Sequence, residues 1–387
     1  MARIFSSFFI LALLAIFSYL MYLKFNLVNY LGVGGHDTFQ YIHWAELIFS
    51  PDRVLIFFRP VLYTVLGFFL YLLDFSSSIF YYFTHSFFIL NLLLIFIISK
   101  KLNLSYFSTL IIFIFLTYSE LWLTADAFGF ISSFETFWIL CILLSSLSYL
   151  KNRSIFLLAL NFIIAVALIL THEEKIIFTS IIFLVISRYS IKTFALLMIS
   201  KISFIVFLFF ALGGQTYDEN SLRIAGSVAT SWNNHLDFFG NIYITFLSAT
   251  SVFSFLESSL FLLSLSFLTL YFLYSTFLLF RNNNLQDIFN LDKLLRHYKK
   301  QVNNLFQKIF MNNSGEKYYL HLFFIPAFFY LVSIGILFAG LDLPRTTAPV
   351  LITFFIGFIY LAEKLKILRS YKTKVLIEYL LITRKII

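Results

Sequence analysis

Three short polar stretches and one Arg-Pro pair hold the residues of this sequence that could do chemistry. The first stretch contains His36, Asp37 and Tyr41. Asp37 and Tyr41 are four residues apart, so a helix from about Thr38 to Phe49 would present them on one face. Asp37 would then lie at the helix start, where the dipole favours a carboxylate. A helix cap and a general base or metal-binding carboxylate are both open interpretations.

A charged turn and a late arginine complete the set. His172, Glu173, Glu174 and Lys175 follow one another between two apolar runs, where an ordinary tight turn would use Gly, Asn or Pro. A solvated turn and a substrate-binding turn are the two alternatives. Arg345 precedes the last apolar run. Because a cation at a helix N-terminus opposes the dipole, an anionic partner explains Arg345 better than capping does.

The composition places these residues in a membrane protein. Of the 387 residues, 60% are hydrophobic and only 12% are charged, and the mean hydropathy is +0.90. Soluble domains carry about 25% charged residues, so an all-α integral membrane protein is expected. One cysteine, Cys141, leaves no pair for a disulfide and no cysteine metal site within the chain.

About ten apolar runs approach the roughly 20 residues that a helix needs to cross a bilayer. They lie near 4–28, 79–99, 104–121, 131–150, 155–171, 175–190, 193–212, 258–280, 319–340 and 347–363. Arg59-Pro60 interrupts a further run. Proline is tolerated in the first turn of a helix but breaks its interior, so we expect a helix over 60–73 that begins at Pro60 and lies along the membrane interface.

The connecting segments complete a single polytopic domain over 1–387. We expect a long first outer loop at 31–78, an outer loop at 213–240, a cytoplasmic loop at 281–318 and a cytoplasmic tail at 364–387. Around the second outer loop, Glu120, Asp126 and Glu135 are weaker candidates for a site, because polar residues in such loops are usually just solvated.

The basic residues set the orientation. With the N-terminus in the cytoplasm, most of the 28 Lys and Arg residues fall in cytoplasmic segments, as the positive-inside rule requires. Both termini are therefore expected in the cytoplasm, and the polar stretches on a periplasmic, extracellular or lumenal face. The net charge of +9 follows from this topology and from attraction to anionic membrane lipids, so no nucleic-acid partner is expected. Lys24 and Lys201 lie inside apolar runs and could snorkel.

The order and common sidedness of these motifs resemble the polytopic glycosyltransferases of the GT-C fold class, which include the protein O-mannosyltransferases and aminoarabinose transferases. The resemblance consists of an acidic residue in the first outer loop followed by Tyr and Ala (Asp37, Tyr41, Ala45), Arg59-Pro60 before an apolar helix, the charged turn at 172–175, and Arg345. Many relatives have a second acidic residue beside the first, where this sequence has His36.

The resemblance implies transfer of a sugar from a polyprenyl-phosphate donor to a glycan, lipid or protein acceptor on the outer face, with inversion. Asp37 would be the base, and Arg59, Lys175 or Arg345 would hold the donor phosphate. The remaining expected substrate-binding residues are His36, Tyr41, His172, Glu173 and Glu174. A divalent ion (Mg or Mn) on Asp37 and Glu173 is an open alternative.

Two other classes of protein remain open. A transporter or lipid flippase would place ionisable residues near the membrane midplane, and Lys201, in the middle of an apolar run, favours this class. A non-catalytic membrane protein that retains a GT-C-like fold is the third class. The exchange of Asp37 for Asn distinguishes the enzyme from the other two classes, because it would abolish catalytic activity and leave transport or scaffolding intact.

Overall fold

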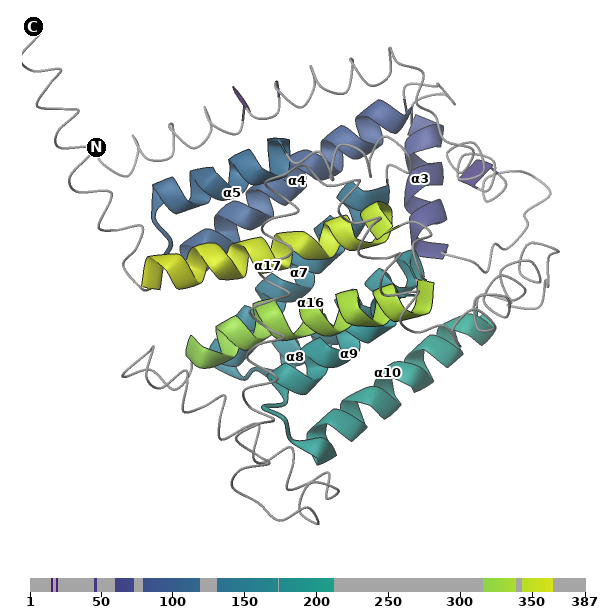
Figure 1. Ribbon diagram of the computed structural model, residues 1–387. Helices are drawn as coiled ribbons and strands as arrows, with labels where there is room; N and C mark the ends of the chain where they lie inside the picture. The colour runs from purple at the N-terminus through teal and green to yellow at the C-terminus, as the bar shows by residue number, and fades with distance from the viewer. Residues whose placement is uncertain are drawn as a thin grey trace, which may run out of the picture.

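The computed structural model describes residues 15–16, 19, 45–46, 60–72, 79–118, 131–172, 174–211, 316–338 and 343–364. Within these ranges the chain is helical and contains no strand (Figure 1). The expected all-α class is confirmed for this part of the chain. Most of the expected first span, the expected span 258–280 and the loop 213–240 lie outside the described residues.

Nine helices have defined bounds in the described part of the chain. They are α3 (Pro60–Leu72), α4 (Ile79–Lys101), α5 (Tyr106–Tyr118), α7 (Ile131–Asn152), α8 (Ile155–Thr171), α9 (Lys175–Ile186), α10 (Ile191–Ala211), α16 (Glu316–Phe338) and α17 (Leu343–Lys364).

These bounds agree with the sequence pattern at eight of the ten apolar runs. The helix expected after the Arg-Pro pair is also present, and α3 begins at Pro60 as predicted. α17 begins at Leu343, before the predicted start near residue 347, because Pro344 occupies the first helical turn, where its missing N–H leaves no bond unmade.

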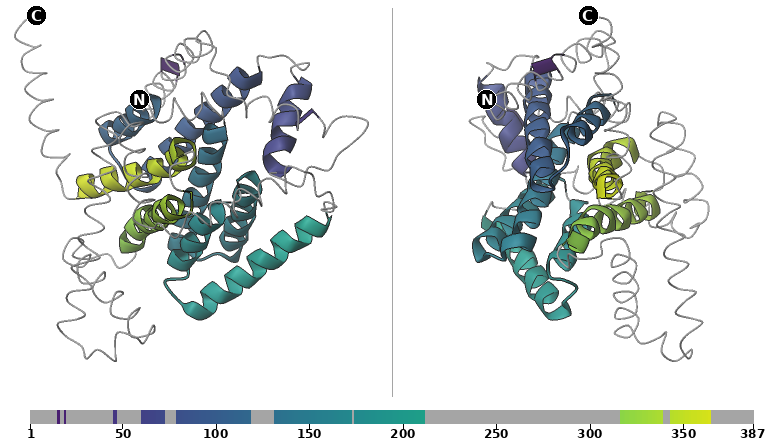
Figure 2. Two further views of the ribbon diagram at one scale, coloured as in Figure 1. Left: turned by 45° about the vertical axis from the view of Figure 1, so that its right-hand side comes forward. Right: turned by 90° about the vertical axis from the view of Figure 1, so that its left-hand side faces the viewer.

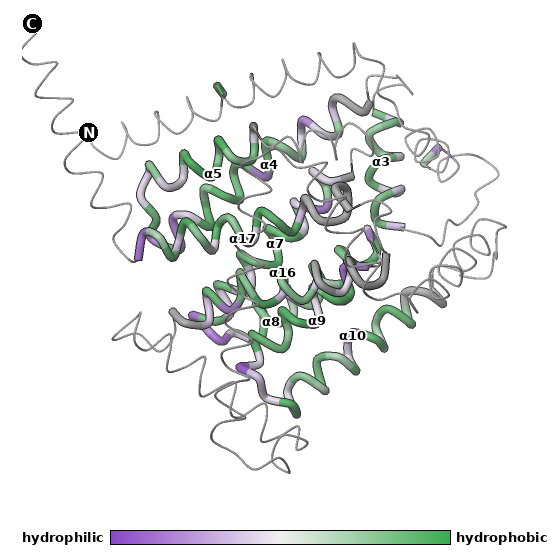
Figure 3. Tube along the Cα trace, in the orientation of Figure 1, coloured by the Kyte–Doolittle hydropathy of each residue, from purple (hydrophilic) through white to green (hydrophobic). Residues whose placement is uncertain are grey.

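Two of the described helices, α4 and α7, are long and apolar enough to cross a membrane by length and composition, over Tyr82–Lys101 and Ser132–Asn152. Others are shorter. α9 has 12 residues and so rises only about 18 Å, less than the roughly 30 Å thickness of a bilayer's hydrocarbon core. Green apolar residues follow the helices in Figure 3, and purple polar residues gather near their ends.

α7 is central to the bundle, where it packs against α4, α8, α9, α16 and α17. Polar side chains connect it to its neighbours: Asn91 Nδ2 of α4 donates to the Ser133 carbonyl at 2.8 Å, and Ser146 Oγ donates to Asn161 Oδ1 of α8 at 2.7 Å. Small and polar residues at helix contacts are typical of bundles that lack a strong hydrophobic drive for association.

The helices alternate in direction, so the bundle has two distinct ends. The tight turns after α4, α7 and α9 lie at one end, together with the start of α16 and the end of α17 (Figures 1 and 2). Basic residues lie at these turns and helix ends, among them Lys101, Lys151, Arg153, Arg188 and Lys364. At this end Arg153 Nη1 donates to the Ile186 carbonyl at 2.8 Å. We call this the basic end.

The opposite end holds α3, which runs across the ends of its neighbours rather than along them (Figure 1). Its buried face, which includes Leu62 and Leu66, packs in one apolar cluster with Phe83 of α4 and Phe134 of α7. Ala45, from the segment that precedes α3, is fully buried in the same cluster. Ala45 therefore contacts the bundle next to the start of α7. We call this the α3 end.

Candidate functional site

A cluster of ionisable side chains is buried inside the bundle near the α3 end. Glu135 is the fifth residue of α7, and His172 and Glu174 flank the junction between α8 and α9. Lys175 is the first residue of α9, and Tyr330 comes from α16. Three separate parts of the sequence thus meet at one point, which we call the Glu135–Lys175 cluster.

The two carboxylate oxygens of Glu135 contact two different partners. Oε2 lies 3.0 Å from Lys175 Nζ, and Oε1 lies 3.3 Å from His172 Nδ1. His172 Nδ1 is also 3.3 Å from Lys175 Nζ and 3.8 Å from Glu174 Oε2. The imidazole therefore faces an ammonium donor and two carboxylate acceptors, and its tautomer decides which contact is a hydrogen bond.

Tyr330 connects the ion pair to Glu174. Lys175 Nζ donates to Tyr330 Oη at 2.6 Å, and Tyr330 Oη donates to Glu174 Oε2 at 3.4 Å. The Lys175 ammonium also lies 4.7 Å from the centre of the Tyr330 ring, a cation–π contact. Lys175 is thus stabilised by a carboxylate, a phenol oxygen and an aromatic face.

Burial decides between the two interpretations of the charged turn. Lys175 is 0% exposed, Glu135 1% and His172 4%, so the solvated-turn alternative is wrong for His172 and Lys175. Charges in a low-dielectric interior are stable only when they are paired and hydrogen-bonded, and Glu135 supplies that pairing.

The same geometry argues against Lys175 as a ligand of the donor phosphate. Its side chain is fully buried, and its charge is already offset by Glu135 at 3.0 Å. A phosphate at this ammonium would also approach the Glu135 carboxylate, and like charges repel. Among the described residues no group of three His, Cys, Asp or Glu is arranged to hold a metal ion.

The structure brings three predicted substrate-binding residues together: His172, Glu174 and Lys175. Arg345 is the third residue of α17, and α17 begins at the α3 end of the bundle (Figure 1). The predicted residues that lie outside the described part of the chain are His36, Asp37, Tyr41, Arg59 and Glu173.

The sequence indicates one residue of the cluster only as a weak candidate and does not indicate another at all. Glu135 stood among the weaker outer candidates, although a carboxylate at the start of a long apolar run already indicated a buried partner. Tyr330 was not predicted. It is one of 23 tyrosines, and nothing in its local sequence distinguishes it, because its role depends on the packing of α16 against α9.

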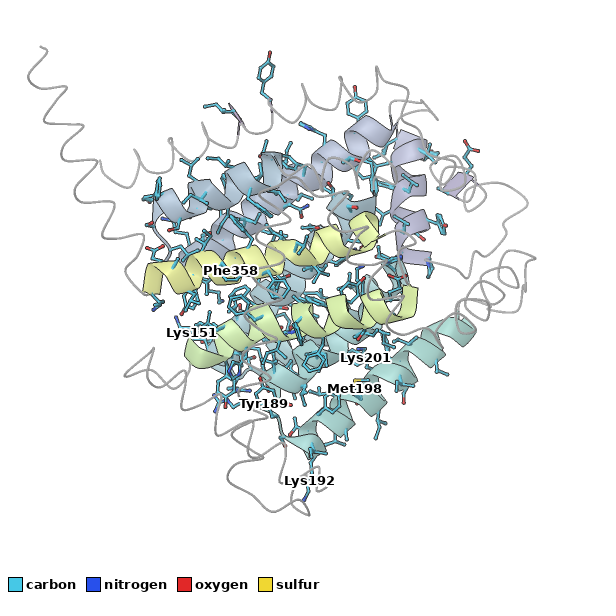
Figure 4. The ribbon with its side chains drawn as sticks, in the orientation of Figure 1. Lys151, Tyr189, Lys192, Met198, Lys201 and Phe358 are labelled. Carbon is cyan, nitrogen blue, oxygen red and sulfur yellow. The ribbon has the colours of Figure 1, made fainter. Side chains whose placement is uncertain are left out.

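A second buried cation lies between α9 and α10. Lys201 is 0% exposed, and Nζ donates to Thr179 Oγ1 at 2.7 Å and to Ser180 Oγ at 3.0 Å. Its ammonium also lies 5.3 Å from the centre of the Phe183 ring. The expectation that Lys201 snorkels is wrong, because its side chain lies on the face of α10 turned toward α9. Lys192, by contrast, lies at the basic end of α10 (Figure 4).

Comparison of the chain with models of known protein families, with characterised proteins and with solved structures gave no match.

Proposed function

We propose that this protein is a multi-pass membrane glycosyltransferase that moves a sugar from a polyprenyl-phosphate donor to an acceptor on its outer face. The observation that carries the proposal is the buried Glu135–Lys175 cluster at the α3 end of the bundle. Ionisable groups at such depth are costly and usually mark a functional site. Arg345, which the sequence assigns to the donor phosphate, lies in the first turn of α17, and α17 begins at the same end (Figure 1).

The packing of Ala45 supports this placement for the proposed base. Ala45 is buried against α3 and Phe134, which precedes Glu135 in α7. Asp37 precedes Ala45 by eight residues in the sequence. The proposal therefore assigns the base to the segment whose Ala45 contacts this end of the bundle.

In the proposed reaction Asp37 takes the proton of an acceptor hydroxyl as its oxygen bonds to the anomeric carbon of the sugar. The bond from that carbon to the phosphate oxygen breaks, and the electron pair leaves with polyprenyl phosphate. Arg59 and Arg345 would stabilise the charge of the departing phosphate. Attack opposite to the leaving group gives inversion.

The proposed orientation of the protein in the membrane follows from the distribution of its basic residues. The basic end would face the cytoplasm, because Lys and Arg accumulate on that side of a membrane. Both termini would lie there as well, and the α3 end would face the periplasm, the cell exterior or a lumen. α3, which crosses the helix ends (Figure 1), would lie along the outer interface.

A transporter is the second candidate, and Lys201 is the observation that favours it. A fully buried ammonium on α10, held by hydroxyl groups of α9, has the position expected of a residue on a substrate or ion pathway. The two candidates differ in their sensitivity to mutation, since Lys201→Met would abolish transport through this position and leave glycosyl transfer unchanged.

The donor assignment can be tested without knowledge of the acceptor. Purified protein in nanodiscs is titrated with polyprenyl phosphate and with polyprenyl-phosphate sugars, for the wild type, Arg345→Ala and Lys192→Ala. We expect saturable binding that weakens at least about tenfold for Arg345→Ala, because a charge-assisted contact to phosphate is lost, and that is unchanged for Lys192→Ala at the basic end. A well-folded wild type that binds none of these lipids would refute the donor assignment. Equal binding by Arg345→Ala would refute the role of Arg345.

A further inference from the structure

Two hydrogen bonds of the Glu135–Lys175 cluster lead from Lys175 through Tyr330 to Glu174. Lys175 has only donors, so its 2.6 Å contact to Tyr330 Oη uses a lone pair of the phenol oxygen. The phenol proton is then directed to its other neighbour, Glu174 Oε2, at 3.4 Å. Glu135 Oε2 lies 3.0 Å from the same Lys175 ammonium and forms an ion pair with it. The order of contacts is Glu135, Lys175, Tyr330, Glu174.

Glu174 is the most exposed residue of the cluster. The side chains of Glu135, Lys175 and His172 are 2%, 0% and 5% exposed, whereas that of Glu174 is 13% exposed. Glu174 is also the residue that precedes α9, and its side chain does not cap the helix. The carboxylate of Glu174 is therefore the part of the cluster that a molecule from the α3 end would meet first.

We infer that Glu174 binds hydroxyl groups of the sugar carried by the lipid donor, and that Tyr330 is a positioning residue that holds the Glu174 carboxylate for this contact. This inference rests on the proposed glycosyltransferase function. A carboxylate has lone pairs for about four hydrogen bonds, so the bond from Tyr330 leaves capacity for sugar hydroxyls. Its negative charge would repel the donor phosphate, so the contact at Glu174 is to the sugar and not to the phosphate.

Ser132 adds a second indication of a polar ligand. It lies three residues before Glu135, on the same face of α7, and its side chain is fully buried. In the part of the chain that the structure describes, Ser132 Oγ has no hydrogen-bond partner. A buried hydroxyl without a partner is costly, and a bound polyol or water at the cluster would satisfy it.

The test compares lipids that differ only in the sugar. Polyprenyl phosphate and mannosyl- or glucosyl-phosphate polyprenol are titrated against nanodiscs of the wild type, Glu174→Gln, Tyr330→Phe and the control Tyr360→Phe. Tyr360 is an equally buried tyrosine near the basic end of α17. We expect the wild type and the control to prefer one of the sugar-bearing lipids about tenfold, the effect of a hydrogen bond to a charged group. Glu174→Gln and Tyr330→Phe should lose this preference and bind the bare lipid as the wild type does.

The outcomes separate the inference from the function on which it rests. A wild type that binds neither kind of lipid refutes the proposed function. A wild type that binds both kinds equally overturns the inference alone, as does an unchanged preference in Glu174→Gln. Equal weakening of both lipids in the two variants would show a merely structural role and would also overturn the inference. If Tyr330→Phe does not fold, Glu174→Gln decides alone, because its shape is conserved and its side chain is partly exposed.

Discussion

Replacement of Glu135 by leucine tests whether the buried cluster is an ion pair on which the bundle depends. At the observed separation of 3.0 Å, Coulomb attraction between Glu135 and Lys175 is about 5.5 kcal/mol at an effective dielectric constant of 20. Removal of one partner leaves the other charge buried, which costs about 3–5 kcal/mol in proteins. We therefore expect Glu135→Leu to lower the free energy of unfolding by that amount.

A double-mutant cycle with Lys175→Met distinguishes the pair from its separate residues. Lys175→Met alone is expected to cost a similar amount, because it leaves the Glu135 carboxylate buried. The double variant, which has neither charge, should lie within about 1 kcal/mol of the wild type, since apolar replacements of a buried pair are often neutral.

The assay is equilibrium unfolding of purified protein in mixed micelles by titration with a denaturing detergent. Glu363→Leu is the matched control, a buried carboxylate at the basic end that accepts the Ser105 N–H at 3.0 Å and contacts no basic side chain in the described part of the chain. It should cost about 1–2 kcal/mol, because the Ser105 N–H loses its charged hydrogen-bond acceptor. A cost below about 1 kcal/mol for Glu135→Leu would refute the reasoning. So would a double variant whose loss equals the sum of the single losses.

Two further substitutions test the packing around the site. Lys201→Met should change the free energy of unfolding by no more than about 1 kcal/mol, because Thr179 and Ser180 keep their own hydrogen bonds to the Ile176 carbonyl. A loss of several kcal/mol in the same titration would show that the Lys201 ammonium stabilises the fold. Gly357→Ala should destabilise the protein by about 1–3 kcal/mol, because an added Cβ would lie 2.8 Å from Phe323 Cβ on α16, which cannot move without the helix. Unchanged stability of Gly357→Ala would mean that α16 and α17 pack less closely.

Much of the helical layout was predictable because apolar runs and proline obey local rules. Pro60 marked the start of α3 because a proline in the first turn of a helix leaves no hydrogen bond unmade. The boundaries of α17 shifted because Pro344 fits that first turn equally well. The basic residues at the turns predicted which helix ends lie together, and the alternating directions of the described helices agree with this prediction.

The candidate site was predictable only in part, because its contacts join residues that are distant in sequence. The row His172–Lys175 was recognised from its local charge density. The pairing of Lys175 with Glu135 and Tyr330 spans 40 and 155 residues and depends on how α7, α9 and α16 pack. Lys175 consequently changes from an expected phosphate ligand to the central cation of a buried network.

The exchange of Asp37 for Asn tests the central claim, glycosyl transfer, most directly. Radiolabelled polyprenyl-phosphate sugar is supplied to native membranes, which contain the acceptor, with either the wild type or Asp37→Asn at matched levels. The account predicts release of polyprenyl phosphate and transfer of label by the wild type, and at least about a hundredfold loss in Asp37→Asn without loss of donor binding. Equal release by Asp37→Asn, or no release from any sugar donor by the wild type, would contradict it.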